Sequence, residues 1–401
     1  MPSTSKNIAL FIDGTWNESR SGFKTNVRKL FEATKSRVDG IDQVKFYVPG
    51  VGRAPVMDMP GRHGVDAAYL RTVYFWRELG ALRALRRPML GGMGHGTESR
   101  IQAMYHVLCQ EYDYRRRDDR VFLFGFSRGA FAACSLAGFL EYVGVLMREH
   151  ISLVPRAFEL YVLSQDPAKS ELRAFLHKLT GRAYAGPDGP FALPVHLLGV
   201  WDVVGALGLS SRSEAFRKRF AGFHRVELPP NVMHARHGLA LHELRPDFEP
   251  TLWQNPGTHR SLEQVWFPGS HADVGGGYAQ SRSAYSDTAL AWMAAQARDK
   301  DLQLDWGHAW LNPPPHKHGL HHESKGWFYR LAPQPRSWLT ADEDRRPDVC
   351  HFHVSARDHL LDPARRSYAF RPAVNAALNQ VDALAATALL GSRLSGRRLV
   401  E

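Results

Sequence analysis

The chain has 401 residues, a formal net charge of +11 and three cysteines. Its length allows one elaborated α/β domain with a large core, and its 44% hydrophobic and 23% charged residues are ordinary for a globular protein. The basic residues are scattered rather than gathered into a stripe interleaved with aromatic residues, which argues against nucleic-acid binding. Three widely spaced cysteines argue against a disulfide framework and for folding in a reducing cytosol.

The sequence predicts neither a secretion signal nor a membrane span. The first apolar run, residues 8–12, is too short for the apolar part of a signal peptide. The longest apolar candidate, residues 136–147, is interrupted by Glu141 and falls short of the ~18 residues that a spanning helix needs. We therefore expect a protein that is made in the cytoplasm without a signal peptide.

Short apolar runs alternate with helical patterns along the chain. Strands are predicted over 7–12, 44–48, 121–124, 195–201 and 264–267, and helices over 98–112, directly after 129, and over 286–298. Strands that are apolar on both faces and alternate with helices predict an α/β fold with a mostly parallel sheet covered on both sides. We expect one domain over 1–401, with insertions near the site at 53–90 and 145–190 and an irregular C-terminal part over 301–401.

The strongest motif is Gly-Phe-Ser-Arg-Gly at 125–129, which lies between a buried-strand run and a small, apolar helical run. A serine at such a strand-to-helix turn is pushed out of the sheet, where a base can reach its hydroxyl, and the flanking glycines prevent clashes with the neighbouring backbone. Ser127 is therefore the candidate nucleophile. The alternative is a tight turn in which Ser127 only caps the helix.

A serine nucleophile needs a general base and a carboxylate that orients the base. Asp202 and His271 each follow a predicted strand, and functional groups of doubly wound sheets collect beyond the carboxyl ends of strands. The chain order Ser127, Asp202, His271 is that of α/β-hydrolases. Asp273 is a rival carboxylate, and Asp202 is equally suited to cap a helix that begins at Val203.

An oxyanion hole requires backbone N–H groups from two segments. The Arg128 N–H, at the start of the helix after the serine, is one candidate donor. The loop after the first predicted strand supplies the other, through the N–H of Gly14 or Thr15, with Asp13 as the residue that fixes this loop. The alternative is a glycine turn that only closes the strand.

Two further patterns are weaker. The glycine-rich stretch 91–96 lacks the Lys-Ser/Thr ending of a P-loop and follows no clear strand, so nucleotide binding is not predicted. Four histidines lie close together without a carboxylate or thiolate pattern, which favours a solvated loop over a metal site: His316, His318, His321 and His322. The sequence therefore predicts no metal and no cofactor.

Several segments, in order, resemble the α/β-hydrolase catalytic domain of the type VI secretion phospholipase effectors, first catalogued as a domain of unknown function. They are Phe-Ile-Asp-Gly-Thr-Trp-Asn at 11–17, Gly-Phe-Ser-Arg-Gly-Ala at 125–130, Gly-Val-Trp-Asp-Val-Val-Gly at 199–205, the residues at 235–237 and 239–241, and the segment 266–278. His-Val-Ser at 353–355, Arg357, Tyr368 and Arg-Pro at 371–372 resemble the family's C-terminal signature. The resemblance covers most of residues 7–375.

The resemblance implies that Ser127 is the nucleophile, Asp202 its acid and His271 its base, which favours Asp202 over Asp273 and leaves Asp273 a supporting role. It implies a serine esterase or lipase of phospholipase A type, which cleaves carboxylic esters and, in the effector members, phospholipid acyl chains. It also implies an immunity or delivery protein as partner and export by a type VI system.

The net charge of +11, the 10 tryptophans and the arginine-rich segment 53–90 predict a protein that works peripherally at an anionic membrane surface. A hydrolase of soluble esters and a non-catalytic interaction protein of the same fold are the alternative functions. The presence of all three candidate triad residues favours an enzyme.

Overall fold

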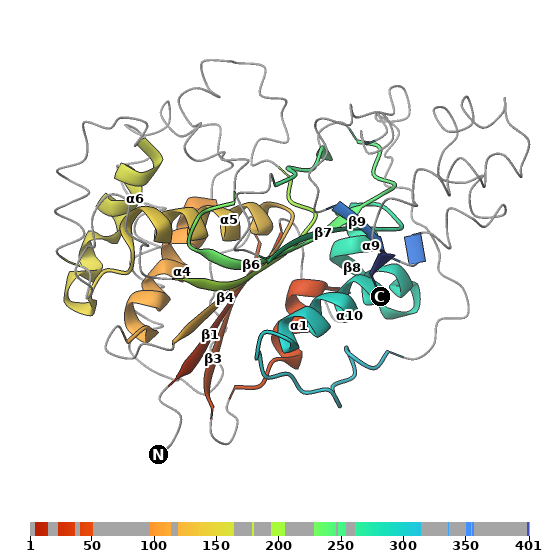
Figure 1. Ribbon diagram of the computed structural model, residues 1–401, viewed down its shortest axis with the longest axis horizontal. Coiled ribbons are helices and arrows are strands. Elements are labelled where there is room, and N and C mark those ends of the chain that lie inside the picture. Colours follow the sequence, from red (N-terminus) through yellow and green to blue (C-terminus); the bar gives the residue numbers. More distant parts are fainter. Residues whose placement is uncertain are drawn as a thin grey trace, which may run out of the picture.

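The chain folds around one parallel β-sheet with helices on both of its faces (Figure 1). The computed structural model describes residues 5–14, 23–36, 41–50, 97–113, 119–163, 179, 194–204, 228–245, 248–253, 261–313, 336, 350–353, 355–356 and 399–400. Within them the main sheet has eight strands in the order β10-β9-β7-β6-β5-β4-β1-β3, and every neighbouring pair is parallel. The expected α/β architecture is confirmed.

The strands of the main sheet are β1 (Lys6–Ile12), β3 (Asp42–Val48), β4 (Arg120–Phe126), β5 (Val195–Trp201), β6 (Val232–Ala240), β7 (Ser261–Phe267), β9 (Cys350–His353) and β10 (Leu399–Val400). The α-helices are α1 (Asn26–Ala33), α4 (Thr97–Glu111), α5 (Arg128–Val143), α6 (Val154–Leu163), α9 (His271–Gly275) and α10 (Ala284–Arg298), and the 3₁₀ helices are η1 (Arg148–Leu153) and η4 (Gln280–Arg282). A separate antiparallel pair joins β2 (Phe23–Thr25) to β8 (Gly276–Ala279).

The strand order reverses between β1 and β4. The chain passes from β1 outward to β3 and then returns to place β4 on the other side of β1. Ligands of open α/β sheets bind beyond the carboxyl ends of the strands at such a switch point. The loop after β1 and the turn after β4 therefore flank the position where this fold class builds its sites.

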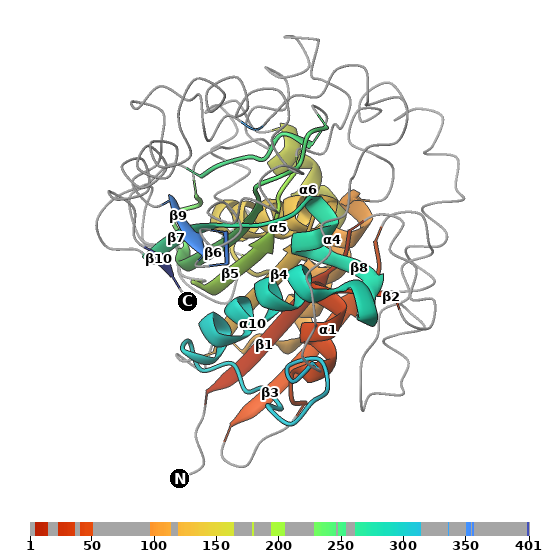
Figure 2. The same cartoon turned by 90° about the vertical axis from the view of Figure 1, so that its right-hand side faces the viewer.

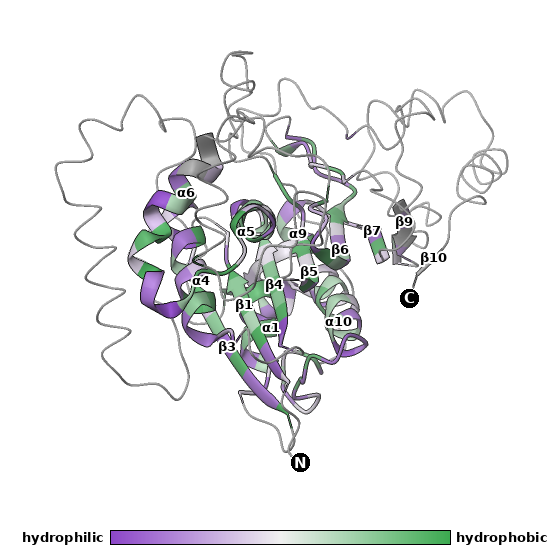
Figure 3. Cartoon of the chain, turned by 60° about the vertical axis from the view of Figure 1, so that its left-hand side comes forward, coloured by the Kyte–Doolittle hydropathy of each residue, from purple (hydrophilic) through white to green (hydrophobic). Residues whose placement is uncertain are grey.

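The helices form two layers (Figure 2): α4, α5 and α6 cover one face of the sheet, and α1 and α10 cover the other. β1 shows why both faces are apolar, because Ile8, Leu10 and Ile12 pack on the α4–α5 side, whereas Ala9 and Phe11 pack on the α1–α10 side. All five are fully buried. Hydropathy colouring shows green segments along the central strands and purple segments on the outer turns of the helices (Figure 3).

Most predicted elements occur within a few residues of their predicted bounds, and the strand over 195–201 agrees at both ends. The sequence does not predict β6, because polar residues interrupt its apolar pattern. The structure satisfies these buried groups: Arg236 pairs with Glu263 at 3.5 Å, and His237 Nε2 accepts the Val203 N–H at 3.1 Å. Burial lowers the pKa of His237 to about 4, so its imidazole is neutral and serves as an acceptor.

The short strands β2, β8, β9 and β10 are also absent from the sequence prediction. Of the predicted insertions, residues 53–90 lie outside the described residues, as does most of 164–190, while η1 and α6 agree with the helical prediction for the first part of 145–190. The stretch 91–96 and the histidines of 316–322 also lie outside them. Among the described helices, none is both long enough and apolar enough to cross a membrane.

Candidate active site

The register of the sheet brings the ends of five strands to one edge. Ile12 pairs with Gly125, Phe126 with Trp201, Trp201 with Gly238, and Ala240 with Phe267. The residues that follow β4, β5, β6 and β7 therefore share the carboxyl edge of the sheet. Ser127 and Asp202 come directly after β4 and β5, and His271 follows β7 after three residues.

Ser127 occupies the sharp turn that the sequence predicts. Its φ of 57° and ψ of −125° lie in a region that residues with a side chain rarely adopt, and such strain concentrates at functional positions. Its N–H donates to the Trp201 carbonyl at 3.1 Å, and its side chain makes no cap hydrogen bond to α5. The alternative in which the Ser127 hydroxyl only caps the helix is therefore not the conformation present.

Gly129 lets the first turn of α5 press against the end of β1. A Cβ at this position would lie 2.5 Å from the Asp13 carbonyl oxygen and closer still to that of Ile12. These are backbone atoms of a central strand, and they cannot move aside cheaply. The close approach places the start of α5, with the Arg128 N–H, beside the loop that follows β1.

Asp13 holds that loop with both carboxylate oxygens. Oδ2 accepts the hydroxyls of Thr25 at 2.7 Å and Tyr47 at 2.6 Å, and Oδ1 accepts the Gly14 N–H at 2.7 Å. Burial and the Asp13 charge raise the pKa of Tyr47 well above its usual range, so its hydroxyl remains a donor. Asp13 therefore joins the start of this loop to Thr25 and Tyr47, and the Gly14 N–H is engaged in one of its contacts. Thr15 lies outside the described residues.

Asp202 is fully buried at the end of β5, with a φ of 42°. Its Oδ2 lies 2.6 Å from Nδ1 of His271, and its Oδ1 accepts the Ala240 N–H at 3.0 Å. The residue opens no helix within the described residues that follow it, 203–204. The structure thus brings Asp202 and His271 together, as the strand-end argument predicts.

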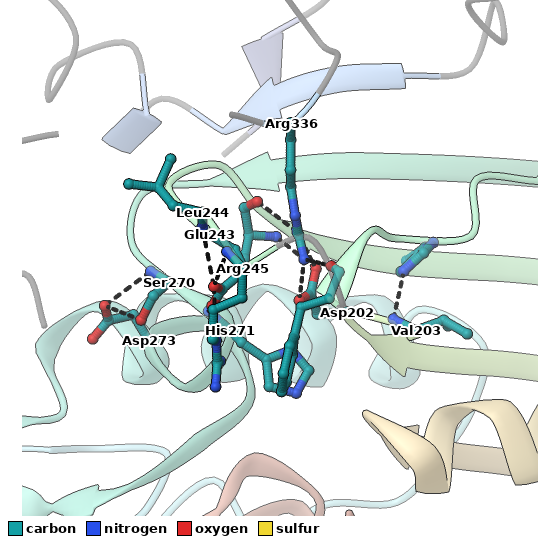
Figure 4. A network of polar contacts seen from close by, with 12 residues as sticks. Asp202, Val203, Glu243, Leu244, Arg245, Ser270, His271, Asp273 and Arg336 are labelled. Atoms are coloured by element: carbon teal, nitrogen blue, oxygen red, sulfur yellow. Dashed lines mark hydrogen bonds and ion pairs between the residues drawn. The ribbon is translucent and has the colours of Figure 1, made fainter. Parts of the chain in front are cut away.

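Arg336 also reaches Asp202, and sequence reasoning missed it (Figure 4). Its Nη1 donates to Oδ1 at 2.6 Å and its Nη2 to Oδ2 at 2.9 Å. Burial alone would raise the pKa of Asp202, but the Arg336 charge and the hydrogen bonds from His271 and Arg336 hold it far below its usual range. The Asp202 carboxylate therefore stays ionised although no solvent reaches it.

His271 is the first residue of α9 and is buried. Its imidazole lies between two aromatic rings, with the Phe126 centroid 4.6 Å away and the Phe248 centroid 4.8 Å away. Phe126 directly precedes Ser127, so the ring contact places the imidazole beside the serine turn. Three consecutive glycines, 275–277, follow in the same segment. Gly275 ends α9 and the next two glycines begin β8, and a Cβ at Gly275 would strike the Phe126 ring.

Glu243, a second buried carboxylate, fixes the backbone of His271. Its Oε2 accepts the His271 N–H at 3.1 Å, and its side chain pairs with Arg245 through contacts of 2.9 Å. Burial favours the protonated form, but the hydrogen bonds and charge of Arg245 outweigh this and lower the pKa of Glu243 to about 2. Nothing in the sequence pattern distinguishes Glu243 from other acidic residues after strands.

Asp273 binds the backbone and the hydroxyl of Ser270, the residue that precedes His271. Its Oδ2 accepts the Ser270 N–H at 2.9 Å and the Ser270 hydroxyl at 3.0 Å, which forms a capping box at the start of α9. Asp273 therefore stabilises the helix end that carries His271.

The described residues contain no group of three or more histidine, cysteine or acidic side chains able to hold a metal ion. Two described cysteines have free thiols, Cys109 and Cys134. Burial raises the pKa of the Cys134 thiol to about 12 and that of Cys109 further. Neither thiol is therefore available as a nucleophile at neutral pH.

A family model described as the type VI secretion system phospholipase effector Tle1-like catalytic domain matches residues 6–296. The chain belongs to this family. The matched range holds Ser127, Asp202 and His271, whereas Arg336 lies beyond it.

Individual relatives are distant and longer. The uncharacterized protein YEL023C of Saccharomyces cerevisiae is 27% identical over 247 residues, which are 62% of this chain and 32% of that protein. An uncharacterized protein from Pseudomonas aeruginosa has a TM-score of 0.40 and 21% identity, over 76% of this chain and 47% of that one. The Tle1 effector bound to the VgrG spike of the type 6 secretion system has a TM-score of 0.36 and 20% identity, over 70% and 52%. The chain thus spans about a third of the curated relative and about half of each structure.

Proposed function

We propose that this chain is a serine hydrolase of carboxylic esters, with Ser127 as nucleophile, His271 as general base and Asp202 as the carboxylate that orients the base. The observation that carries the proposal is the 2.6 Å contact between His271 Nδ1 and Asp202 Oδ2. It fixes the tautomer with the proton on Nδ1 and leaves Nε2 able to accept the proton of Ser127. The strained turn at Ser127 supports the assignment of the nucleophile.

In this mechanism the Ser127 oxygen attacks the ester carbonyl while its proton moves to Nε2 of His271. The tetrahedral intermediate collapses, and the departing alcohol takes that proton. A water molecule then gives a proton to Nε2 of His271 as it attacks the acyl-serine. The second tetrahedral intermediate collapses, the Ser127 oxygen leaves and takes that proton back from His271, and the carboxylic acid is released. Asp202 stays ionised throughout and stabilises the imidazolium that forms in each half of the reaction.

The oxyanion requires two donors in this mechanism. The Arg128 N–H at the start of α5 is one, because the first N–H groups of a helix have no partner within it. Of the two candidates in the loop after β1, the N–H of Thr15 is the better second donor, since that of Gly14 already donates to Asp13. Asp13 acts as the residue that positions this loop.

The proposed substrates are phospholipid acyl esters, which makes the enzyme a phospholipase A-type esterase. Membership in a phospholipase-effector family supports this class, and the net charge of +11 suits peripheral docking at an anionic membrane. Export by a type VI system, with a delivery or immunity protein as partner, belongs to the same proposal. We also propose that the whole chain forms one domain, because β9 and β10 extend the sheet begun by β1.

The nucleophile is tested with a fluorophosphonate probe and mass spectrometry of the labelled peptide. Wild-type protein is expected to carry the label on Ser127, and Ser127→Ala to lose both labelling and ester hydrolysis at nearly unchanged thermal stability. The matched control is Ser135→Ala in the helix that follows Ser127, because the buried Ser135 hydroxyl has no hydrogen-bond partner among the described residues. Labelling at another serine, with hydrolysis retained in Ser127→Ala, would overturn the assignment.

The substrate class is tested with purified protein and vesicles. We expect sedimentation with anionic vesicles at low salt, weaker sedimentation as salt rises, and fatty-acid release that increases when the substrate is aggregated. Each basic contact adds only about 1 kcal/mol, so binding should be reversible. Equal or faster hydrolysis of short soluble esters, with no vesicle binding at any salt concentration, would replace the phospholipid substrate with a soluble ester.

A further inference from the structure

Arg336 comes from a part of the chain far from the triad. It stands 134 residues after Asp202 and beyond the range matched by the family model. Only 2% of its surface is exposed. A fully buried arginine that meets a buried carboxylate through two contacts of 2.6 and 2.9 Å has the geometry of a bidentate ion pair. Such a pair fixes both the position and the plane of the Asp202 carboxylate.

The same guanidinium binds two backbone carbonyls of the β6–β7 connection. Nη1 donates to the Ala240 oxygen at 2.6 Å, and Nη2 donates to the Phe248 oxygen at 2.5 Å. Ala240 in turn donates its N–H to Asp202, and the Phe248 ring stands edge-on to the His271 ring with an interplanar angle of 75°. The Arg336 side chain therefore binds the Asp202 carboxylate, the end of β6 and the backbone of Phe248, whose ring packs against His271.

Two of the carboxylates around His271 are each paired with an arginine. Asp202 faces the imidazole Nδ1 and is paired with Arg336, while Glu243 faces the His271 backbone and is paired with Arg245. Asp273 caps the helix that begins with His271. Glu249 interacts electrostatically with both Arg336 and Asp202. Removing the charge of Arg336 would leave a buried anion whose nearest titratable partner is His271, and that anion would hold a proton on the imidazole.

We propose that Arg336 is a positioning residue of the active site: it fixes the Asp202 carboxylate against His271 and compensates its charge, so that the imidazole is oriented without being kept protonated. This inference rests on the proposed triad. Arg336 touches no reacting atom, and it acts through Asp202 and through the connection that carries Phe248. Its role therefore separates into a charge effect on the pH dependence and a geometric effect on the plateau rate.

The two effects are separated by two substitutions. Arg336→Gln removes the charge and keeps part of the hydrogen bonding, whereas Arg336→Lys keeps the charge but cannot bridge both carboxylate oxygens and both carbonyls. The matched control is Arg236→Gln. Arg236 is equally buried and pairs with Glu263, but it lies within β6 away from the carboxyl edge. Hydrolysis of a short ester is measured from pH 5 to 9, with the melting temperature of each variant.

For Arg336→Gln we expect the acid limb of the kcat/KM profile to move to higher pH by about one unit or more, with a plateau lowered about tenfold or more. Arg336→Lys should keep the wild-type acid limb and lower only the plateau. Arg236→Gln should reduce the melting temperature and leave both the limb and the plateau unchanged. A change in the acid limb or the plateau rate that the control does not share distinguishes positioning from a general loss of stability.

The proposal is overturned if folded Arg336→Gln keeps the wild-type acid limb. If that variant does not fold, Arg336→Lys decides, since a wild-type plateau and a wild-type limb together would exclude a positioning role. Failure of the triad itself is seen separately, in wild-type protein that is not labelled at Ser127 and in Ser127→Ala protein that keeps its activity.

Discussion

Gly129→Ala adds one methyl group at the contact between the serine turn and β1. Its Cβ would lie 2.5 Å from the Asp13 oxygen and closer to that of Ile12, whereas carbon and oxygen atoms that are not bonded normally stay about 3.3 Å or more apart. The obstacle is the backbone of a strand held between β3 and β4, so α5 must move. The expected displacement is on the order of 1 Å, and it carries Ser127 and the Arg128 N–H with it.

Overpacking of this kind typically costs about 1–3 kcal/mol, which corresponds to a fall in melting temperature of several degrees for a protein of this size. A 1 Å misplacement of reacting groups costs about 10²-fold in rate. We therefore expect Gly129→Ala to fold with a lower melting temperature and to react with the fluorophosphonate probe about 10²-fold more slowly. The loss in labelling rate should exceed what the small unfolded fraction explains.

The control is Gly307→Ala, because the nearest atom to a Cβ at Gly307 is Asp305 Oδ1 at 3.4 Å, an ordinary contact. This variant should match the wild type in both melting temperature and labelling rate. If Gly129→Ala also matches the wild type in both measurements, the close approach of α5 to β1 does not position the nucleophile, and the placement of the oxyanion loop beside Ser127 must be abandoned.

Three further predictions concern the carboxylates. Asp202→Asn and Arg336→Gln should each cost about 3–5 kcal/mol of unfolding free energy in urea titrations, because each leaves a buried partner unpaired. The double variant should lose clearly less unfolding free energy than the sum of the two single losses. As a control, the exposed pair Arg120–Asp301 should show a coupling energy of at most about 1 kcal/mol. Additive losses at Asp202 and Arg336 would refute the pairing. Asp273→Asn should lower kcat less than about tenfold, against about 10⁴-fold for Asp202→Asn, and the reverse order would exchange the two roles. The pKa of Glu243 is lowered to about 2, so its stabilising contribution is complete above the usual glutamate pKa and is lost as the pH falls through about 2. The difference in melting temperature between wild type and Glu243→Gln should therefore shrink as the pH falls over this range. A difference that stays constant with pH would contradict the prediction.

The sequence was sufficient for those parts of the fold that depend on local patterns. Buried parallel strands such as β1 and β5 read as apolar runs, and the turn at Ser127 is marked by the glycines at 125 and 129, whose Cβ atoms would strike neighbouring backbone. Asp202 and His271 could be selected because functional groups gather where parallel strands end. In each case a few neighbouring residues contain the information.

The rest depends on contacts between distant segments. β6 lacks an apolar pattern because it carries the buried polar residues Arg236 and His237. Their partners, Glu263 and the Val203 N–H, lie outside any short sequence window around β6. Glu243 acquires its role only because the connection after β6 folds against the start of α9. The engaged N–H of Gly14 depends on the side-chain conformation of Asp13, which the residue order does not specify.

The proposed mechanism gives a reason for the two arginines around His271, although its chemistry uses neither. In that mechanism, a histidine in contact with two buried and uncompensated carboxylates would keep its proton and would be unable to accept the proton of Ser127. Each carboxylate carries its own arginine, Asp202 with Arg336 and Glu243 with Arg245. The carboxylates can therefore orient the ring and its backbone while the local charge stays balanced. Because Arg336 enters from beyond the matched catalytic domain, the C-terminal part of the chain takes part in that balance.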